Sequence, residues 1–380
     1  MRSDANTGRH GRRPTIEGMT THTSALLTLP GAVAASGVDG GVAWHYGDPT
    51  VEQRRAEQGV GLVDRDQRGV ITVIGADRHD WLNKLTSQLL LPLADGTTTQ
   101  ALVLTPQGHV EYHFGVTEVG DTTYLDTDAG TDEGLSKYLQ MMKFWSDVEV
   151  TVRSNDFQQL SLIGPRASEV GARLGLGQVE AGCAVPLPEG GFLRATDTGL
   201  DFVVPHDRAL TLAQQLIAGG ATPVGTWADD ALRIPTRRVR TGVDTDDRTI
   251  PHEVGLLGVA VHMNKGCYRG QETVARVANL GRPPRRLVML NLDGTQDVLP
   301  NPGDDILTDQ GRVVGRVGTV AIHYEDGPIA LALVKRNIGP ETPLLAGGVD
   351  ARIDPADVAP ENAAPASAID RATFTKIRPR

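Results

Sequence analysis

The chain has 380 residues, of which 39% are apolar and 22% charged, and its formal net charge is −10. This composition is typical of a folded globular protein with two or three domains of about 100–200 residues each. The acidic balance argues against a general nucleic-acid binder, because phosphates are neutralised by clustered Lys and Arg. Two cysteines are too few for a disulfide framework, and no apolar run approaches the ~20 residues of a membrane helix. We therefore expect a cytoplasmic protein without nucleic-acid or membrane partners.

The N-terminal stretch, residues 1–40, is rich in Gly, Ser, Thr and Ala without periodicity, which predicts a disordered extension. Arg12 and Arg13 precede a mildly apolar run, so a twin-arginine export signal is an alternative interpretation. An acidic residue and a Pro-Gly break within that stretch disfavour it. Met19 is an alternative start, which would make residues 1–18 an extension of the gene model.

Residues 41–284 alternate between strand and helix patterns, and their first half covers about residues 44–153. A β-branched run, Val70 to Ile74, ends at Gly75, and Asp77 is the expected N-cap of the helix that follows. Two strands joined by a turn, a third strand, a helix and a last strand come next, at residues 101–104, 110–116, 123–126, 135–142 and 148–152.

The same order returns over about residues 154–284. An offset of 89 places Gly75 on Gly164 and Trp81 on Val170. This repetition predicts duplicated α+β halves that pack their sheets together. The second copy is expected to have a strand, a helix, a hairpin and a helix capped by Asp207, at residues 160–163, 170–174, 192–204 and 210–217.

The pattern changes at Arg285. Short strands separated by Gly, Pro, Asn and Asp turns run through residues 285–353, at 287–292, 305–307, 312–320 and 329–334. Evenly spaced short strands of this kind predict a small antiparallel β-barrel. The last residues, 354–380, are rich in Ala and Pro and predict a disordered tail.

The segment with the clearest chemistry surrounds Cys267, on a glycine-flanked loop just before a predicted helix. Gly266 and Gly270 permit backbone geometries that other residues avoid, and they let a ligand approach closely. A helix N-terminus with Lys265 and Arg269 nearby in sequence favours the thiolate. The pattern therefore predicts a reactive cysteine.

The competing interpretation is that both cysteines are buried small hydrophobic residues, which is the usual role of a lone cytosolic cysteine and our expectation for Cys183. A metal set of Cys267 with His206, His252 and His262 is conceivable. No pair among these four has helical or CxxC-like ligand spacing, so no metal site is predicted.

Residues 265–272, Lys-Gly-Cys-Tyr-x-Gly-Gln-Glu, resemble the signature of the YgfZ family, tetrahydrofolate-dependent proteins implicated in iron–sulfur cluster assembly and repair. A wider resemblance to the GcvT-like aminomethyltransferase superfamily covers roughly residues 44–352, including Gly61–Asp64 and Pro302–Asp304. It implies an α+β fold with two interleaved folate-binding subdomains, closed into a ring by a C-terminal antiparallel β-barrel.

This resemblance also implies a site. Tetrahydrofolate or a one-carbon derivative would occupy the centre of the ring, and Cys267 would face that cavity or its rim as a nucleophilic or redox thiol. Lys265 would lower the pKa of the thiol. The partners would be folate and iron–sulfur client or assembly proteins. The expected ligand-binding or loop-shaping residues are Gly266, Tyr268, Gly270, Gln271 and Glu272.

Two departures weaken the interpretation as a true aminomethyltransferase. The glycine cleavage enzymes carry paired aspartates after a Gly-rich turn, where this chain has Glu111 and Tyr112. Their Arg-Ile-Glu segment ends here at Pro235. Glu111 and Glu253 are the remaining candidates for holding the pterin. Whether the protein is an enzyme is thus left open, with a folate-dependent aminomethyl or one-carbon transferase as one alternative.

A second alternative is a binding module in which folate is only structural. The chain has no P-loop and no GxGxxG after a strand, which argues against a GTPase or a flavin dehydrogenase. A basic cluster is either a solvated face or a set of internal ion pairs, or else it attracts the glutamate tail of folate or a partner. Its members are Arg233, Arg237, Arg238 and Arg240.

Overall fold

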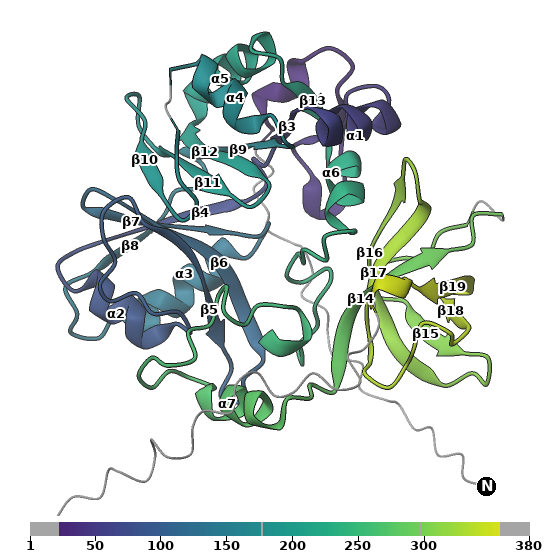
Figure 1. The fold of residues 1–380 in the computed structure, drawn as a ribbon. Helices are drawn as coiled ribbons and strands as arrows, with labels where there is room; N and C mark the ends of the chain where they lie inside the picture. Colours follow the sequence, from purple (N-terminus) through teal and green to yellow (C-terminus); the bar gives the residue numbers. More distant parts are fainter. Residues whose placement is uncertain (1–22, 176–177, 296–297, 358–380) are drawn as a thin grey trace, which may run out of the picture.

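The computed structural model describes residues 23–175, 178–295 and 298–357. The three largest β structures in this part of the chain are a five-stranded sheet, a six-stranded sheet and a closed six-stranded barrel, and a two-stranded sheet accompanies them. In Figure 1 they lie around a common centre, with the barrel on the right. The predicted class, an α+β fold of two subdomains closed into a ring by a C-terminal barrel, is confirmed.

The first sheet has the strand order β5-β6-β7-β4-β8. Helices α2 and α3 pack against it, and their apolar residues Leu82 and Leu139 share a core with Ile71 and Leu125 of the strands. The elements are β4 (Gly69–Ile74), α2 (Arg78–Leu85), β5 (Thr98–Leu104), β6 (Val110–Val119), β7 (Thr122–Thr127), α3 (Asp132–Met141) and β8 (Glu149–Val152).

The second sheet has the order β10-β11-β12-β9-β3-β13. Helices α4 and α5 supply Val170 and Leu216 to its core, which also contains Leu162 and Phe202. The elements are β3 (Gly61–Asp64), β9 (Phe157–Ile163), α4 (Ala167–Arg173), β10 (Ala184–Pro186), β11 (Phe192–Thr196), β12 (Gly199–Pro205), α5 (His206–Ala218) and β13 (Thr222–Val224).

The two sheets share one strand pattern, with β3 inserted in the second between the counterparts of β4 and β8. Gly75 and Gly164 end the matching strands β4 and β9, with φ of +116° and +107°. A Cβ at either glycine would lie 2.2 Å from a backbone oxygen. The two glycines thus have the same positive-φ conformation at corresponding ends of two strands. The boundary near residue 153 does not separate the two sheets. Strand β3 (residues 61–64) precedes that boundary in sequence but pairs with β9 in the second sheet.

The barrel closes in the order β14-β17-β16-β15-β18-β19. Its interior is filled by small and branched side chains such as Val288, Ala332 and Leu344. The last two strands, which are three and five residues long, were not predicted. The bounds are β14 (Arg285–Leu292), β15 (Asp305–Thr308), β16 (Val313–His323), β17 (Gly327–Lys335), β18 (Leu344–Ala346) and β19 (Val349–Ile353).

The predicted disorder of residues 1–40 is wrong for the segment after residue 23. This segment forms η1 (Ala25–Thr28), β1 (Val33–Ala34) and η2 (Gly37–Asp39), and β1 pairs with β2 (Ala43–His45). Leu26 is 1% exposed in the hydrophobic core of the second sheet, and this burial stabilises the folded segment. α1 (Pro49–Gln58) follows.

The predicted tail begins too early as well, since η4 (Pro355–Asp357) is ordered. The Asp357 carboxylate accepts hydrogen bonds from Met289 N and from Arg237. Residues 1–22 and 358–380 lie outside the described residues. The twin arginines of the export-signal alternative and the remainder of both predicted disordered ends fall there, whereas the apolar run of that alternative, residues 25–35, lies within the described residues.

The barrel is joined to the rest of the ring at Asp244. One carboxylate oxygen accepts from Arg233 Nη1 (2.8 Å) and Arg240 N (2.7 Å), and the other accepts from Thr319 N (2.6 Å) on β16. Arg233 is the last residue of α6 (Thr226–Arg233), and Asp244 lies in the connection to η3 (Pro251–Glu253) and α7 (Gln271–Leu280). Asp244 therefore connects α6, its own loop and the barrel.

We expect Asp244→Ala to lower the free energy of unfolding by about 3–5 kcal/mol, because it removes a buried partner of the Arg233 guanidinium. Urea titration followed by circular dichroism measures this change. Asp350→Ala removes an exposed aspartate on β19 and should change stability by less than about 0.5 kcal/mol. Equal, small effects of the two substitutions would contradict a joining role for Asp244.

Candidate functional site

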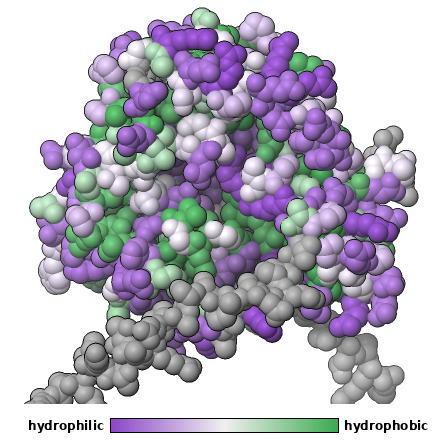
Figure 2. Space-filling model, in the orientation of Figure 1, coloured by the Kyte–Doolittle hydropathy of each residue, from purple (hydrophilic) through white to green (hydrophobic). Residues whose placement is uncertain are grey.

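A polar cavity of about 500 Å³ lies where the two sheets meet the segment around α6. Figure 2 shows this face hollowed at its centre, with hydrophilic atoms inside the hollow and hydrophobic atoms beside it. Its lining contains seven aspartates and six arginines: Asp39, Asp126, Asp128, Asp197, Asp201, Asp229, Asp230, Arg65, Arg68, Arg194, Arg233, Arg238 and Arg240.

Arg194 on β11 joins the two sheets across this cavity. Its guanidinium donates to both oxygens of Asp126 on β7, at 2.5 and 2.9 Å, and to Asp201 on β12 at 2.9 Å. Burial raises the pKa of Asp126, but Arg194 and Arg68 outweigh it and hold that pKa well below its usual range. Asp126 and Arg194 therefore stay charged at neutral pH.

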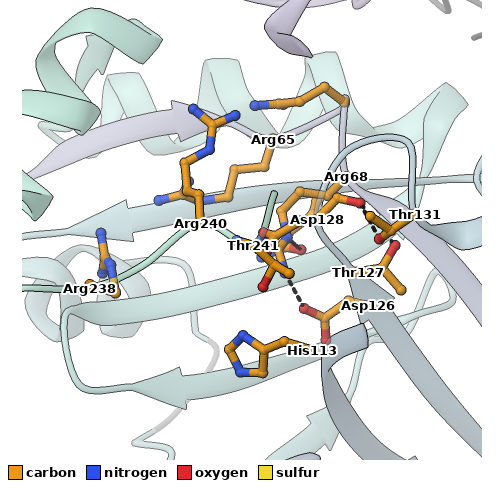
Figure 3. Close-up of polar contacts among 12 residues, drawn as sticks. Arg65, Arg68, His113, Asp126, Thr127, Asp128, Thr131, Arg238, Arg240 and Thr241 are labelled. Atoms are coloured by element: carbon orange, nitrogen blue, oxygen red, sulfur yellow. Dashed lines mark hydrogen bonds and ion pairs between the residues drawn. The ribbon is translucent and has the colours of Figure 1, made fainter. Parts of the chain in front are cut away.

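Other arginine–aspartate ion pairs also lie in the cavity lining. Arg65 donates two parallel hydrogen bonds to Asp229, at 2.9 and 3.0 Å, a bidentate geometry that is strong for this pair of groups. Arg68 pairs with Asp128 at 2.7 Å. Figure 3 shows Arg68 and Asp128 close together beside Arg240. The basic cluster predicted from sequence is thus engaged in internal ion pairs, as Arg233, Arg237 and Arg240 show.

Arg238 is the most weakly paired arginine described in the lining. Its closest carboxylate, that of Asp229, is 3.8 Å away, and its Nη1 donates to Thr198 Oγ1 at 3.1 Å. Its side chain is 39% exposed, and Figure 3 shows it apart from the Arg68–Asp128 pair. Burial lowers the pKa of Arg238, with Arg65 and Arg233 adding repulsion. Arg238 can therefore direct donors at an anionic ligand group.

Two uncharged residues add hydrogen-bonding capacity to the lining. Gln67 Oε1 is buried, and no described residue donates to it. His113 Nε2 lies 2.8 Å from Gln100 Oε1, and burial lowers the pKa of this imidazole. At neutral pH the cavity therefore combines charged donors and acceptors with a neutral imidazole and an open amide acceptor.

Lys265, predicted to act on the thiol, is buried, and its contacts lie at the end of α2. Its Nζ donates to the carbonyl oxygens of Asn83 (2.5 Å), Thr86 (2.7 Å) and Gln88 (2.7 Å). Burial lowers the pKa of this amine to about 8, while the three carbonyls favour its charged form. These hydrogen bonds connect the loop around Cys267 to the C-terminal end of α2 and the residues that follow it. An effect of Lys265 on the Cys267 thiol stays a prediction.

Tyr268 and Gln271 also shape this loop. Tyr268 is buried in an apolar cluster with Leu102 and Val274, and burial raises the pKa of its phenol to about 12. Gln271 Nε2 donates to the Lys265 carbonyl at 3.4 Å. These contacts fix the start of α7.

Gly270 is required by a close backbone approach. It has φ of +82°, and a Cβ there would lie 2.6 Å from the carbonyl oxygen of Thr105 in the β5–β6 turn. At Gly266, by contrast, a Cβ would point into open space with no atom within 4 Å, so close packing does not explain that glycine.

Cys267 is exposed, as are Gly266 and Glu272. Cys183 is exposed too, so its expected burial is wrong. None of the predicted site residues is among the described residues that line the cavity. The lining residue nearest to the cysteine loop in sequence is Val259.

The two pterin candidates have protein partners. Glu111 pairs with Arg269 at 3.2 Å. Glu253 is buried and accepts from Arg285 Nε at 2.9 Å, from Arg285 Nη2 at 2.8 Å and from Ile250 N at 3.1 Å. A role for either in ligand binding stays a prediction.

The comparisons with known proteins agree with this fold. Residues 40–180 match the model of the GCVT N-terminal domain. An aminomethyltransferase of Chromobacterium violaceum is 30% identical over 222 residues, or 56% of this chain and 61% of the relative. A putative chloroplastic transferase of Arabidopsis thaliana is 26% identical over 272 residues, or 69% and 62%. The chain thus spans about three fifths of the length of these two relatives.

A solved structure, the glycine cleavage system aminomethyltransferase T from Bartonella henselae, superposes with a TM-score of 0.75. It is 20% identical, and the match covers 85% of this chain and 92% of that one. The chain therefore has the fold of this aminomethyltransferase, and its sequence is similar to the GCVT N-terminal domain over residues 40–180 and to relatives named aminomethyltransferase.

Two kinds of feature are absent from the described residues. None of their helices combines the length and apolar character needed to cross a membrane. No group of three or more His, Cys, Asp and Glu among them is arranged to hold a metal ion.

The lowered pKa of Asp126 predicts an acid-sensitive fold. A carboxyl with a depressed native pKa stabilises the fold above its ordinary pKa of 3.8, and this contribution is lost as the pH falls below that value. Burial raises the pKa of Asp246, but the hydrogen bonds from Arg285 outweigh burial and lower this pKa to about 2. Asp246 therefore contributes to stability over the same pH range. We expect urea stability to fall from about pH 4 to about pH 2.

The matched variant is Asp126→Asn, which should be less stable than the native chain at pH 7 and lose less stability on acidification. Urea titrations at a series of pH values give both quantities. An unchanged acid dependence in this variant would contradict the assigned role of Asp126.

Proposed function

We propose that this protein binds tetrahydrofolate or a one-carbon derivative in the central cavity. The observation that carries the proposal is the cavity itself, whose volume of about 500 Å³ lies in the range of small-molecule sites. A reduced folate has a pterin rich in N–H donors and a glutamate tail with two carboxylates. The aspartates and Gln67 Oε1 offer acceptors to the first part, and the arginines offer donors to the second.

Within that cavity, Arg238 is the residue that we assign to a ligand carboxylate. Its long 3.8 Å separation from Asp229 leaves its guanidinium less compensated than that of Arg194 or Arg65. A charge-assisted hydrogen bond to an incoming carboxylate would complete its pairing. The lining residues that already form bidentate pairs would then shape the cavity.

We further propose that the protein serves iron–sulfur cluster assembly or repair in the cytoplasm, with Cys267 as its working thiol. This finer role rests on the resemblance of residues 265–272 to the YgfZ signature. The exposure of Cys267 on a loop tied down through Lys265 supports a thiol presented to a protein partner. The cluster would be cargo belonging to the client, since two cysteines do not supply a four-ligand site.

The alternative is a folate-dependent aminomethyl or one-carbon transferase. The relatives named aminomethyltransferase favour it. Against it, Tyr112 stands at one of the two acidic positions, and Glu111 is paired with Arg269 outside the described cavity lining. A module that uses folate only structurally is the third hypothesis, and it predicts no effect of thiol loss.

We expect Arg238→Ala to weaken binding of tetrahydrofolate by about 10–100-fold, the value of a lost hydrogen bond between charged groups. Isothermal titration calorimetry under anaerobic conditions measures the affinity. Arg276→Ala, which removes an exposed arginine on α7 outside the lining, should leave the affinity unchanged. Equal affinities of the native chain and Arg238→Ala would contradict the assignment.

For the thiol, we expect Cys267→Ser to keep the native affinity for tetrahydrofolate and to lose the ability to restore iron–sulfur enzyme activity in cells lacking this protein. Cys183→Ser is the matched control and should restore it fully. Full restoration by Cys267→Ser would refute the role of the thiol. Transfer of a one-carbon group to tetrahydrofolate from an aminomethyl donor by the Cys267→Ser protein would favour the transferase instead.

A further inference from the structure

The five-stranded sheet has a free edge at β8. Among the described strands, β8 pairs only with β4. Arg153 N donates to Val70 O on β4 at 2.7 Å. Because backbone groups of successive residues in a strand point to opposite sides, those of Val150 and Val152 face away from β4. The Val150 carbonyl accepts from Gln140 Nε2 at 3.4 Å, a long contact that a partner strand would have to displace. An edge of this kind is a template for another strand.

An open groove of about 660 Å³ runs beside this edge, between β8 and α3. The strand side of the groove is Val150–Val152, and the helix side includes Ser136 and the polar residues Glu133, Lys137 and Gln140. Glu133 and Lys137 are four residues apart, so they lie on the same face of α3 one turn apart. The groove thus offers one acid and one base in a fixed order along the helix.

Apolar side chains project into solvent at the end of α3 and directly after it. Met141 is 65% exposed, Phe144 73% and Trp145 99%. Phe144 has φ of +43°, a conformation that bulky residues rarely adopt. The turn therefore combines an unfavourable backbone conformation with two aromatic rings in water. Exposed apolar groups of this size mark interaction sites.

We propose that this face binds a second copy of the same chain, through antiparallel pairing of β8 with the partner's β8 about a two-fold axis perpendicular to the sheet. Such an axis joins the two five-stranded sheets into one and places the two α3 helices side by side and antiparallel on the same face. Glu133 of each copy then lies opposite Lys137 of the other.

The charges of Glu133 and Lys137 favour a second copy of this chain over a strongly charged partner. One acid and one base give the groove no net charge, yet their order along α3 is self-complementary under two-fold symmetry. Burial of the exposed Phe144 and Trp145 side chains would supply roughly 300–500 Å² of the about 800 Å² per copy that a stable interface buries. No described residue of this groove lines the central cavity.

Charge reversal tests this dimer. We expect the native chain to dimerise within the range from about 1 to about 100 µM in sedimentation equilibrium, and Lys137→Glu or Glu133→Lys alone to weaken the dimer by at least about 10-fold. The double variant Glu133→Lys/Lys137→Glu restores opposite charges across the axis and should recover the dimer. Lys335→Glu, a charge reversal on the barrel, is the matched control and should leave the dimer intact.

A native chain that stays monomeric throughout this concentration range would overturn the proposal. So would a double variant that remains as weak as the single ones, because the two-fold pairing of the charges would then be absent. Phe144→Gly/Trp145→Ser should weaken the dimer as well. The glycine relieves the positive φ, so a loss of dimer in this variant would not arise from a damaged fold.

Discussion

The structure depends on the neutralisation of buried charge at the centre of the ring. Arg194 must be paired because an isolated guanidinium in this position would be very costly, and its partners Asp126 and Asp201 come from different sheets. The same requirement at Asp244 brings α6 and the barrel together. Interactions that stabilise the ring therefore also create a polar cavity inside it, and the fold and the cavity are consequences of one charge network.

The cavity and the cysteine loop are built by different means. Charged side chains line the cavity, whereas the loop is shaped by backbone contacts: Lys265 binds three carbonyls, and Gly270 allows the β5–β6 turn to approach. Much of the signature around Cys267 can thus be explained by the placement of an exposed thiol. A ligand in the cavity and a partner protein at the thiol could then be present at the same time.

The sequence predicted those features that depend on local patterns. The offset that relates Gly75 to Gly164 identified the duplication, because both positions need the same backbone conformation. Residues 24–39 were missed because their order comes from the burial of Leu26 in a distant core. The cavity was missed because its charges are scattered along the chain. The available signal was a charged residue within an apolar strand, as at Asp126 in β7 and Arg194 in β11.

The most direct test of folate binding at the centre of the ring is a crystal structure of the chain with 5-formyltetrahydrofolate, a stable reduced folate. We expect density for the ligand inside the cavity, with a carboxylate within hydrogen-bonding distance of the Arg238 guanidinium. An empty cavity at a saturating ligand concentration, or a ligand bound only beside Cys267, would contradict the assignment of the cavity as the folate site.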